Sequence, residues 1–117
     1  MRSNDYYPAW LDNLADDVLA LLAHARTLYE FQDFSFIGEY GDDGLVEDYA
    51  STVAGQPIAN IAIVHRNAAG QATRLVMNHR PLTGVLLFSR LMGEHFADTP
   101  YAHYFLSRQQ LDEVYPR

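Results

Sequence analysis

The chain changes its hydrophobic period near residue 30, and this change constrains its fold more than any other feature. Upstream, apolar side chains recur about every 3.6 residues from Trp10 to Tyr29, the spacing of one face of a helix. Downstream, side chains alternate with the period of two that strands show, in four segments: Glu30–Tyr40, Leu45–Ala54, Ile58–Arg66 and Ala72–Arg80. The sequence therefore predicts one unbroken helix over Pro8–Tyr29, followed by a sheet.

The links between the four strand segments are short and turn-like: "GDDG" at 41–44, "GQP" at 55–57 and "NAAG" at 67–70. Links of this length join antiparallel neighbours, so the centre of the chain is predicted to be a four-stranded meander. After Pro81, "LTGVLLFSRLMGEHF" predicts a second helix, and Tyr101–Tyr115 a further one. We expect an α+β protein with a single domain over residues 1–117, a length typical of one domain.

The turns also predict which side chains share a face of the sheet. We pair Asn67 with Gln71, take "GQ" as a two-residue loop, and place Gly41 opposite Leu45. One face, expected to turn toward the helices, then carries Phe34, Phe36, Tyr40, Val46, Asp48, Ala50, Ile61, Ile63, Leu75, Met77 and His79. A slip of one residue at any turn would invert part of this set.

Asp48 is the acidic residue on that otherwise apolar face, with Tyr40 close by and His65 diagonal to it. A carboxylate in an apolar concavity can serve as a general base or acid, with Tyr40 or His65 polarising or orienting the substrate. The alternative is structural, because a buried aspartate is often held by tyrosine hydroxyls or backbone amides. His79 is expected to point inward and Arg80 outward, and His79 is either a pocket residue or a satisfied core residue.

Composition and motifs argue against several classes of partner. A net charge of −7 argues against nucleic acids and anionic membrane surfaces. The absence of cysteine excludes disulfides and thiolate metal sites, and the histidines lack a ligand spacing such as H-E-x-x-H. No apolar run reaches about 18 residues. We expect a cytoplasmic protein with no metal and no cofactor.

Three stretches together resemble the nuclear transport factor 2-like superfamily, in its SnoaL-like branch: "YYPAWLDNLADDV", the charged turn with its meander, and "NHRPLTGVLLFSRLMGEHF". The resemblance covers about residues 6–105. It implies a cone in which a curved antiparallel sheet wraps over helices, with a pocket between them. Several enzymes of the superfamily use a pocket aspartate as base, which here corresponds to Asp48. The pocket is expected to be lined by Phe34, Phe36, Ile61, Ile63, Met77, His79 and Trp10.

The chain departs from the superfamily after "LADDV", where relatives continue into a strand hairpin and a further helix. Here "LALLAHARTLYEF" follows at once, so a strand pair that would lie beside Ala72–Arg80 is missing. Two functions stay open. The first is a small-molecule-binding or dimerisation module with an apolar pocket, which the missing pair favours. The second is an isomerase-like or cyclase-like enzyme that uses Asp48 as base on a small apolar carbonyl compound.

The opposite face of the predicted sheet is also rich in apolar side chains: Ile37, Leu45, Tyr49, Val53, Ile58, Ala62, Val64 and Val76. A monomer rarely exposes so large an apolar patch, and two-fold homodimers are the commonest way to cover one. The resemblance points the same way, because superfamily members often pair through the open face of the sheet. The alternative is that Tyr101–Tyr115 folds back over this face.

Overall fold

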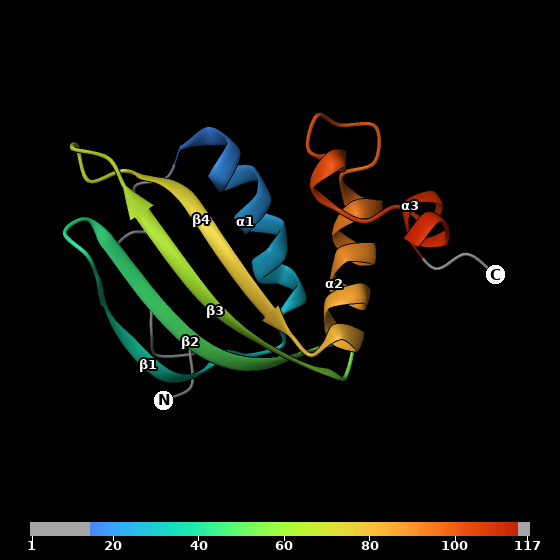
Figure 1. Cartoon of the computed structure of the whole chain (residues 1–117), viewed down its shortest axis with the longest axis horizontal. Coiled ribbons are helices and arrows are strands. Elements are labelled where there is room, and N and C mark those ends of the chain that lie inside the picture. Colours follow the sequence, from blue (N-terminus) through green and yellow to red (C-terminus); the bar gives the residue numbers. More distant parts are fainter. Residues whose placement is uncertain (1–14, 115–117) are drawn as a thin grey trace.

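The computed structural model describes residues 15–114, which form an α+β structure built on one antiparallel sheet. The elements are α1 (Asp16–Leu28), β1 (Asp33–Tyr40), β2 (Gly44–Val53), β3 (Gln56–Arg66), β4 (Ala72–Arg80), α2 (Leu82–His95), the 3-10 helix η3 (Ala102–Tyr104) and α3 (Arg108–Val114). The strand order β1-β2-β3-β4 confirms the predicted meander. Figure 1 shows the curved sheet with α1 alongside β4 and α2 at the end where β4 finishes.

The helix α1 confirms a helix over most of the described part of the prediction, but it begins at Asp16. Ala15 is extended, with φ −67° and ψ 154°, and its N–H donates to the Ala72 carbonyl of β4, so the predicted unbroken helix over Pro8–Tyr29 is wrong at this point. The helix buries one stripe formed by Val18, Leu22 and Ala25, and ends at Leu28. The predicted start at Pro8 and the side chain of Trp10 lie outside the described residues. No strand pair lies between α1 and β1 in the described chain, as the sequence predicted. Among the described residues β4 is therefore an outer strand of the sheet.

The register differs from the predicted one in all three strand pairs. Asp48 pairs with Ile61 and Tyr40 with Gly44, which are shifts of two residues and leave the faces unchanged. Between β3 and β4 the Asn67 N–H donates to the Gln71 carbonyl at 2.9 Å, as the predicted turn requires. An irregularity between His65 and Arg66 then shifts the rest of this ladder by one residue. A bulge of this kind adds one residue to one strand and reverses the faces beyond it.

The predicted inner face is wrong for β2, β3 and most of β1, because α1 and α2 pack on the other side of these strands. The side of the sheet under α1 and α2 buries Glu47, Tyr49, Ser51, Val53, Ile58, Asn60, Ala62 and Val64. The residues expected there lie on the opposite side, which we call the outer face: Phe36, Tyr40, Val46, Asp48, Ala50, Ile61 and Ile63. Phe36 is 57% exposed, as expected if the helices of residues 15–114 do not cover this side.

The prediction is correct for β4 and for Phe34. Met77 pairs with Ala62 and His79 with Asn60, so both side chains face the helices. Phe34 packs against the core beside Tyr49, because an irregularity in β1 separates it from the outward-facing Phe36.

The core fills the space between the sheet and the helices α1 and α2. Its buried residues are Ala25, Tyr29, Tyr49, Val53, Ile58, Ala62, Phe88, Met92 and Phe96. Gly84 lets the first turn of α2 approach the start of β3, because a Cβ there would lie 2.4 Å from the Pro57 carbonyl oxygen. Within residues 15–114 no helix has the length and apolar character needed to cross a membrane.

The C-terminal segment packs beside α2 and does not cover the outer face. The Leu106 N–H donates to Ser89 Oγ at 2.9 Å, and the Phe105 ring stacks near Phe96 with ring centroids 6.0 Å apart. The face that the alternative assigned to Tyr101–Tyr115 is the one with Tyr49, Val53 and Ala62. It is covered mainly by α1 and α2, and Tyr101 and Phe105 pack against the same core. Figure 1 shows α3 beyond α2, at the end of the molecule away from the sheet.

Candidate ligand-binding groove

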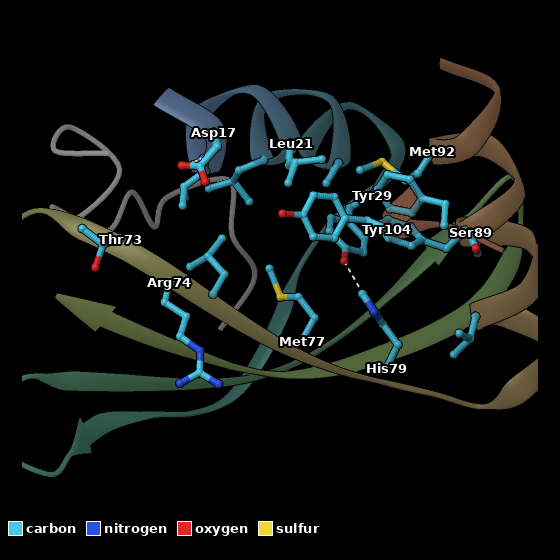
Figure 2. Close-up of a pocket in the computed structure, with 17 residues that line it drawn as sticks. Asp17, Leu21, Tyr29, Thr73, Arg74, Met77, His79, Ser89, Met92 and Tyr104 are labelled. Atoms are coloured by element: carbon cyan, nitrogen blue, oxygen red, sulfur yellow. Dashed lines mark hydrogen bonds between the residues drawn. The ribbon is translucent and has the colours of Figure 1, made fainter. Parts of the chain in front are cut away.

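A groove of about 520 Å³ opens between α1, β4, α2 and the segment around η3. Its walls are mostly apolar and come from Val18, Leu21, Leu22 and Ala25 of α1, Leu75 and Met77 of β4, and Val85, Phe88 and Met92 of α2. Tyr104 and Phe105 complete it from the C-terminal side. Figure 2 shows these side chains converging between the helix α1 and the strand β4.

One polar pair, Tyr29 and His79, lies inside this apolar groove. Tyr29 follows the last residue of α1, and His79 is near the end of β4. Tyr29 Oη and His79 Nε2 are 2.6 Å apart, a hydrogen bond drawn as a dashed line in Figure 2. The Phe88 ring packs against both, with centroids 5.5 Å from Tyr29 and 4.6 Å from His79. The fold therefore joins residues 50 positions apart into a single polar feature of the groove.

Burial keeps both members of the pair uncharged near neutral pH. It lowers the pKa of His79 from 6.5 to about 4, because the imidazolium form loses hydration in the apolar groove. Burial also raises the pKa of Tyr29, with a smaller contribution from Tyr49, so the phenol stays protonated. The pair thus offers hydrogen-bonding groups without a formal charge, while the charged residues Asp17 and Arg74 line another part of the groove.

A buried network behind the groove holds Tyr29 in place. The Tyr49 hydroxyl is hydrogen-bonded to that of Tyr29, and it accepts a hydrogen bond from Asn60 Nδ2 at 2.8 Å. The Asn60 side-chain oxygen accepts from the Asn78 backbone N–H at 2.9 Å. Among the described residues every buried side-chain nitrogen and oxygen atom has a partner, so this network is fully satisfied.

Sequence reasoning missed the parts that Tyr29 and Asn60 play here. The helical period predicts only that Tyr29 ends an apolar stripe, and the alternation of the strands assigns no role to Asn60. The available signal was Asn60 itself, a lone amide within the apolar run "PIANIAIV" of β3. A polar side chain in such a run is either solvent-exposed or held by buried partners.

The three predicted catalytic residues lie on the outer face and not in the groove. Asp48 Oδ1 is 3.4 Å from Arg80 Nη2, and both side chains are partly exposed. Tyr40 contacts His65 edge to face, with ring centroids 6.0 Å apart. Asp48 and His79, which were expected on one face of the sheet, therefore lie on opposite sides of it.

Of the predicted pocket residues, Met77 and His79 line the groove. Phe34 packs on the core, while Phe36, Ile61 and Ile63 lie on the outer face. Within residues 15–114, no three histidine, aspartate or glutamate side chains come together in a way that could hold a metal ion.

Two solved structures share this arrangement of helices and sheet. A steroid delta-isomerase from Pseudomonas aeruginosa superposes with a TM-score of 0.62 at 18% identity, over 68% of this chain and 59% of the other. An uncharacterized protein with a cystatin-like fold from Silicibacter pomeroyi gives a TM-score of 0.64 at 18% identity, over 76% and 63%. The chain thus spans less than two thirds of the length of either protein.

No family model matches the sequence, and no curated protein matches it significantly. At 18% identity the structural matches establish the fold alone. They confirm the curved α+β fold of nuclear transport factor 2-like proteins that the sequence resemblance predicted.

Proposed function

We propose that this chain is a module that binds a small, largely apolar molecule in the groove. The observation that carries the proposal is a hollow of about 520 Å³ with mostly apolar walls from α1, β4 and α2 around the hydrogen-bonded pair of Tyr29 and His79. Small-molecule sites in proteins typically have volumes of about 300–1,000 Å³ and combine apolar walls with a few placed polar groups. The groove meets both criteria.

One of the two fold neighbours supports the same class of ligand. The protein from Pseudomonas aeruginosa is a steroid delta-isomerase by name, and steroids are rigid apolar molecules with few polar groups. In the present chain β4 is an outer strand among the described residues, and the groove runs along it. A ligand would enter at this edge of the sheet.

A fluorescence titration with the uncharged probe N-phenyl-1-naphthylamine tests the proposal. We expect saturable binding by the wild type. Leu21→Trp, which places an indole in the groove, should weaken binding by roughly tenfold or more through steric exclusion. Leu19→Trp is the matched control, because Leu19 is on the same helix but 50% exposed and outside the groove. Equal binding by the two variants, or no binding by the wild type, would refute a ligand site here.

We also propose that the protein forms a homodimer through the outer face. The supporting observation is the exposure of large apolar side chains on this uncovered side: Phe36 at 57%, Tyr40 at 49% and Ile61 at 37%. Val46, Ile63 and Val76 lie among them on neighbouring strands. Apolar patches of this kind mark association surfaces more often than free surface. This set replaces the one expected from the sequence, of which Tyr49, Val53, Ile58, Ala62 and Val64 are core residues.

Sedimentation equilibrium at tens of micromolar tests the dimer. We expect a dimeric wild type and a monomeric Ile61→Glu variant, because the charge would be buried between two outer faces. Leu82→Glu introduces the same charge at a 60% exposed site on α2 and should remain dimeric. Ala62→Glu would be an unsuitable test because Ala62 is buried under the helices. A monomeric wild type would refute the dimer, and a dimeric Ile61→Glu would refute this interface.

A further inference from the structure

His79 has a second ring nitrogen that its bond to Tyr29 leaves unused. Nε2 is engaged by Tyr29 Oη at 2.6 Å, while Nδ1 has no hydrogen-bond partner among the described residues. In the same part of the chain no buried side-chain nitrogen or oxygen atom lacks a partner. His79 lines the groove, so a ligand bound there would lie beside its ring.

We infer that His79 Nδ1 is the recognition point for the polar group of the ligand, and that this group is an uncharged hydroxyl or carbonyl. The inference rests on the proposed function of the groove and specifies its ligand class. The rest of the ligand is apolar, since Met77, Phe88 and Met92 surround the pair.

The surroundings of His79 disfavour a charged ligand group. Burial holds the pKa of His79 at about 4, so the ring brings no positive charge to a carboxylate near neutral pH. An acid at this point would lose hydration without gaining a counter-ion. The charged lining residues Asp17 and Arg74 lie at the other end of the groove from His79 in Figure 2.

The network behind Tyr29 determines whether Nδ1 donates or accepts. If the Tyr29 proton points to His79, Nδ1 carries the imidazole proton and donates to a carbonyl or hydroxyl oxygen. If the Tyr29 proton points to Tyr49, His79 Nε2 donates to Tyr29 and Nδ1 accepts from a hydroxyl. A hydroxyl group fits both tautomers and a ketone fits the first, so comparing 2-naphthol with 2-acetonaphthone identifies the tautomer.

The test compares naphthalene, 2-naphthol and 2-naphthoate near neutral pH on the full chain. His79→Leu should weaken binding of 2-naphthol by roughly tenfold, the effect of losing one buried hydrogen bond, and leave naphthalene within about twofold. His65→Leu removes a histidine from the outer face and should change neither. The wild type should bind 2-naphthoate at least about tenfold more weakly than 2-naphthol.

Each part of the idea can fail separately. Equal losses for naphthalene and 2-naphthol in His79→Leu would overturn the role of Nδ1 and leave the groove as a ligand site. Binding of 2-naphthoate as tight as that of 2-naphthol would overturn the uncharged class. If the wild type binds none of the three, the proposed function itself fails.

Nitrogen NMR of the labelled wild type tests the role of His79 Nδ1 without depending on the folding of a variant. Bound 2-naphthol should shift the Nδ1 resonance of His79, because a new hydrogen bond forms at that atom, and bound naphthalene should shift it much less. An Nδ1 resonance that responds equally to both ligands would overturn the inference.

Discussion

The imidazole rings of His24 and His95 are stacked face to face, with centroids 3.5 Å apart and planes 7° from parallel. His24 is on α1 and His95 is the last residue of α2, so the stack joins the two helices that form walls of the groove. The Phe96 ring contacts both imidazoles edge to face. Two neutral rings can stack in this way, whereas two imidazolium rings at this distance repel each other.

The first prediction concerns titration of the stacked pair. Partial burial lowers the pKa of His24, and the nearby His95 lowers it further. We expect His95→Gln to raise the pKa of His24 part of the way toward 6.5, because the repulsive neighbour is gone. Proton NMR titration of the His24 ring measures this. His65→Gln, a change on the outer face, should leave the His24 titration unchanged, and an equal shift in both variants would contradict the assigned cause.

The second prediction is a loss of stability in acid that depends on His79. Its pKa is lowered from 6.5 to about 4, so below about pH 6.5 the unfolded chain binds a proton that the folded chain does not. This contribution to the free energy of unfolding is therefore fully present above pH 6.5 and falls as the pH drops toward 4. We expect a loss of roughly 1–2 kcal/mol between about pH 7 and pH 5.

Urea unfolding at the two pH values measures this loss. His79→Leu should reduce the pH dependence by about that amount, because the titrating group is absent. His103→Leu, at an exposed position on η3, serves as the control and should retain the dependence of the wild type. If the free energy of unfolding of His79→Leu depended on pH as strongly as that of the wild type, groups other than His79 would cause the dependence.

The third prediction concerns the buried amide of Asn60, which is 0% exposed. Asn60→Ala would remove the donor to Tyr49 Oη and the acceptor of the Asn78 N–H. Leaving buried polar groups without partners should reduce the free energy of unfolding by roughly 2–3 kcal/mol. Asn78→Ala on the neighbouring strand is the matched control. The Asn78 side chain is exposed and donates to the Ile61 carbonyl, so its loss should amount to less than about 1 kcal/mol. Equal losses in urea unfolding would contradict the role of Asn60.

The order of the elements could be predicted from the sequence because it depends on local signals. The helical stripe, the three short turns and the apolar segment after Pro81 are each contained in a few adjacent residues. They correspond to α1, the meander and α2 in the structure. The same signals determine the antiparallel pairing, because links this short leave neighbouring strands no other arrangement.

The faces of the sheet could not be predicted in the same way, because β2 and β3 carry apolar side chains on both sides. The buried side includes Glu47, Ser51 and Asn60, so polarity pointed to the wrong face. Which side of the sheet is covered depends on where α1 and α2 pack. This packing brings together segments that are distant in the sequence, so local patterns do not indicate it. The candidate site depended on this choice, and Asp48 was placed in a pocket that lies on the other side of the sheet.

His79 was nevertheless placed correctly, facing the helices, because two errors cancelled. The predicted faces of β2 and β3 were inverted, and the bulge between His65 and Arg66 inverted β4 relative to them. Bulges add one residue without a strong signature in a single sequence, so this register shift could not be read from the alternation alone. The pairing of His79 with Tyr29 lay beyond sequence reasoning because it joins the end of α1 to the fourth strand.

The last prediction concerns two glycines of α2 that differ in their surroundings. A Cβ on Gly84 would lie 2.4 Å from the backbone oxygen of Pro57, which a side-chain rotation cannot relieve. A Cβ on Gly93 would lie 3.4 Å from Phe105 Cβ, an ordinary contact. Gly84→Ala should therefore reduce the free energy of unfolding by roughly 1–3 kcal/mol, since α2 must move away from β3.

Gly93→Ala is the matched control for this change. It lies within the same helix, where alanine is intrinsically more favourable than glycine by up to about 1 kcal/mol, so it should leave stability unchanged or raise it. Urea unfolding of both variants gives the comparison. The displacement of α2 in Gly84→Ala should also weaken binding of N-phenyl-1-naphthylamine, because Val85 and Phe88 on the same helix line the groove. A fully stable Gly84→Ala variant would show that α2 does not approach Pro57 as closely as described.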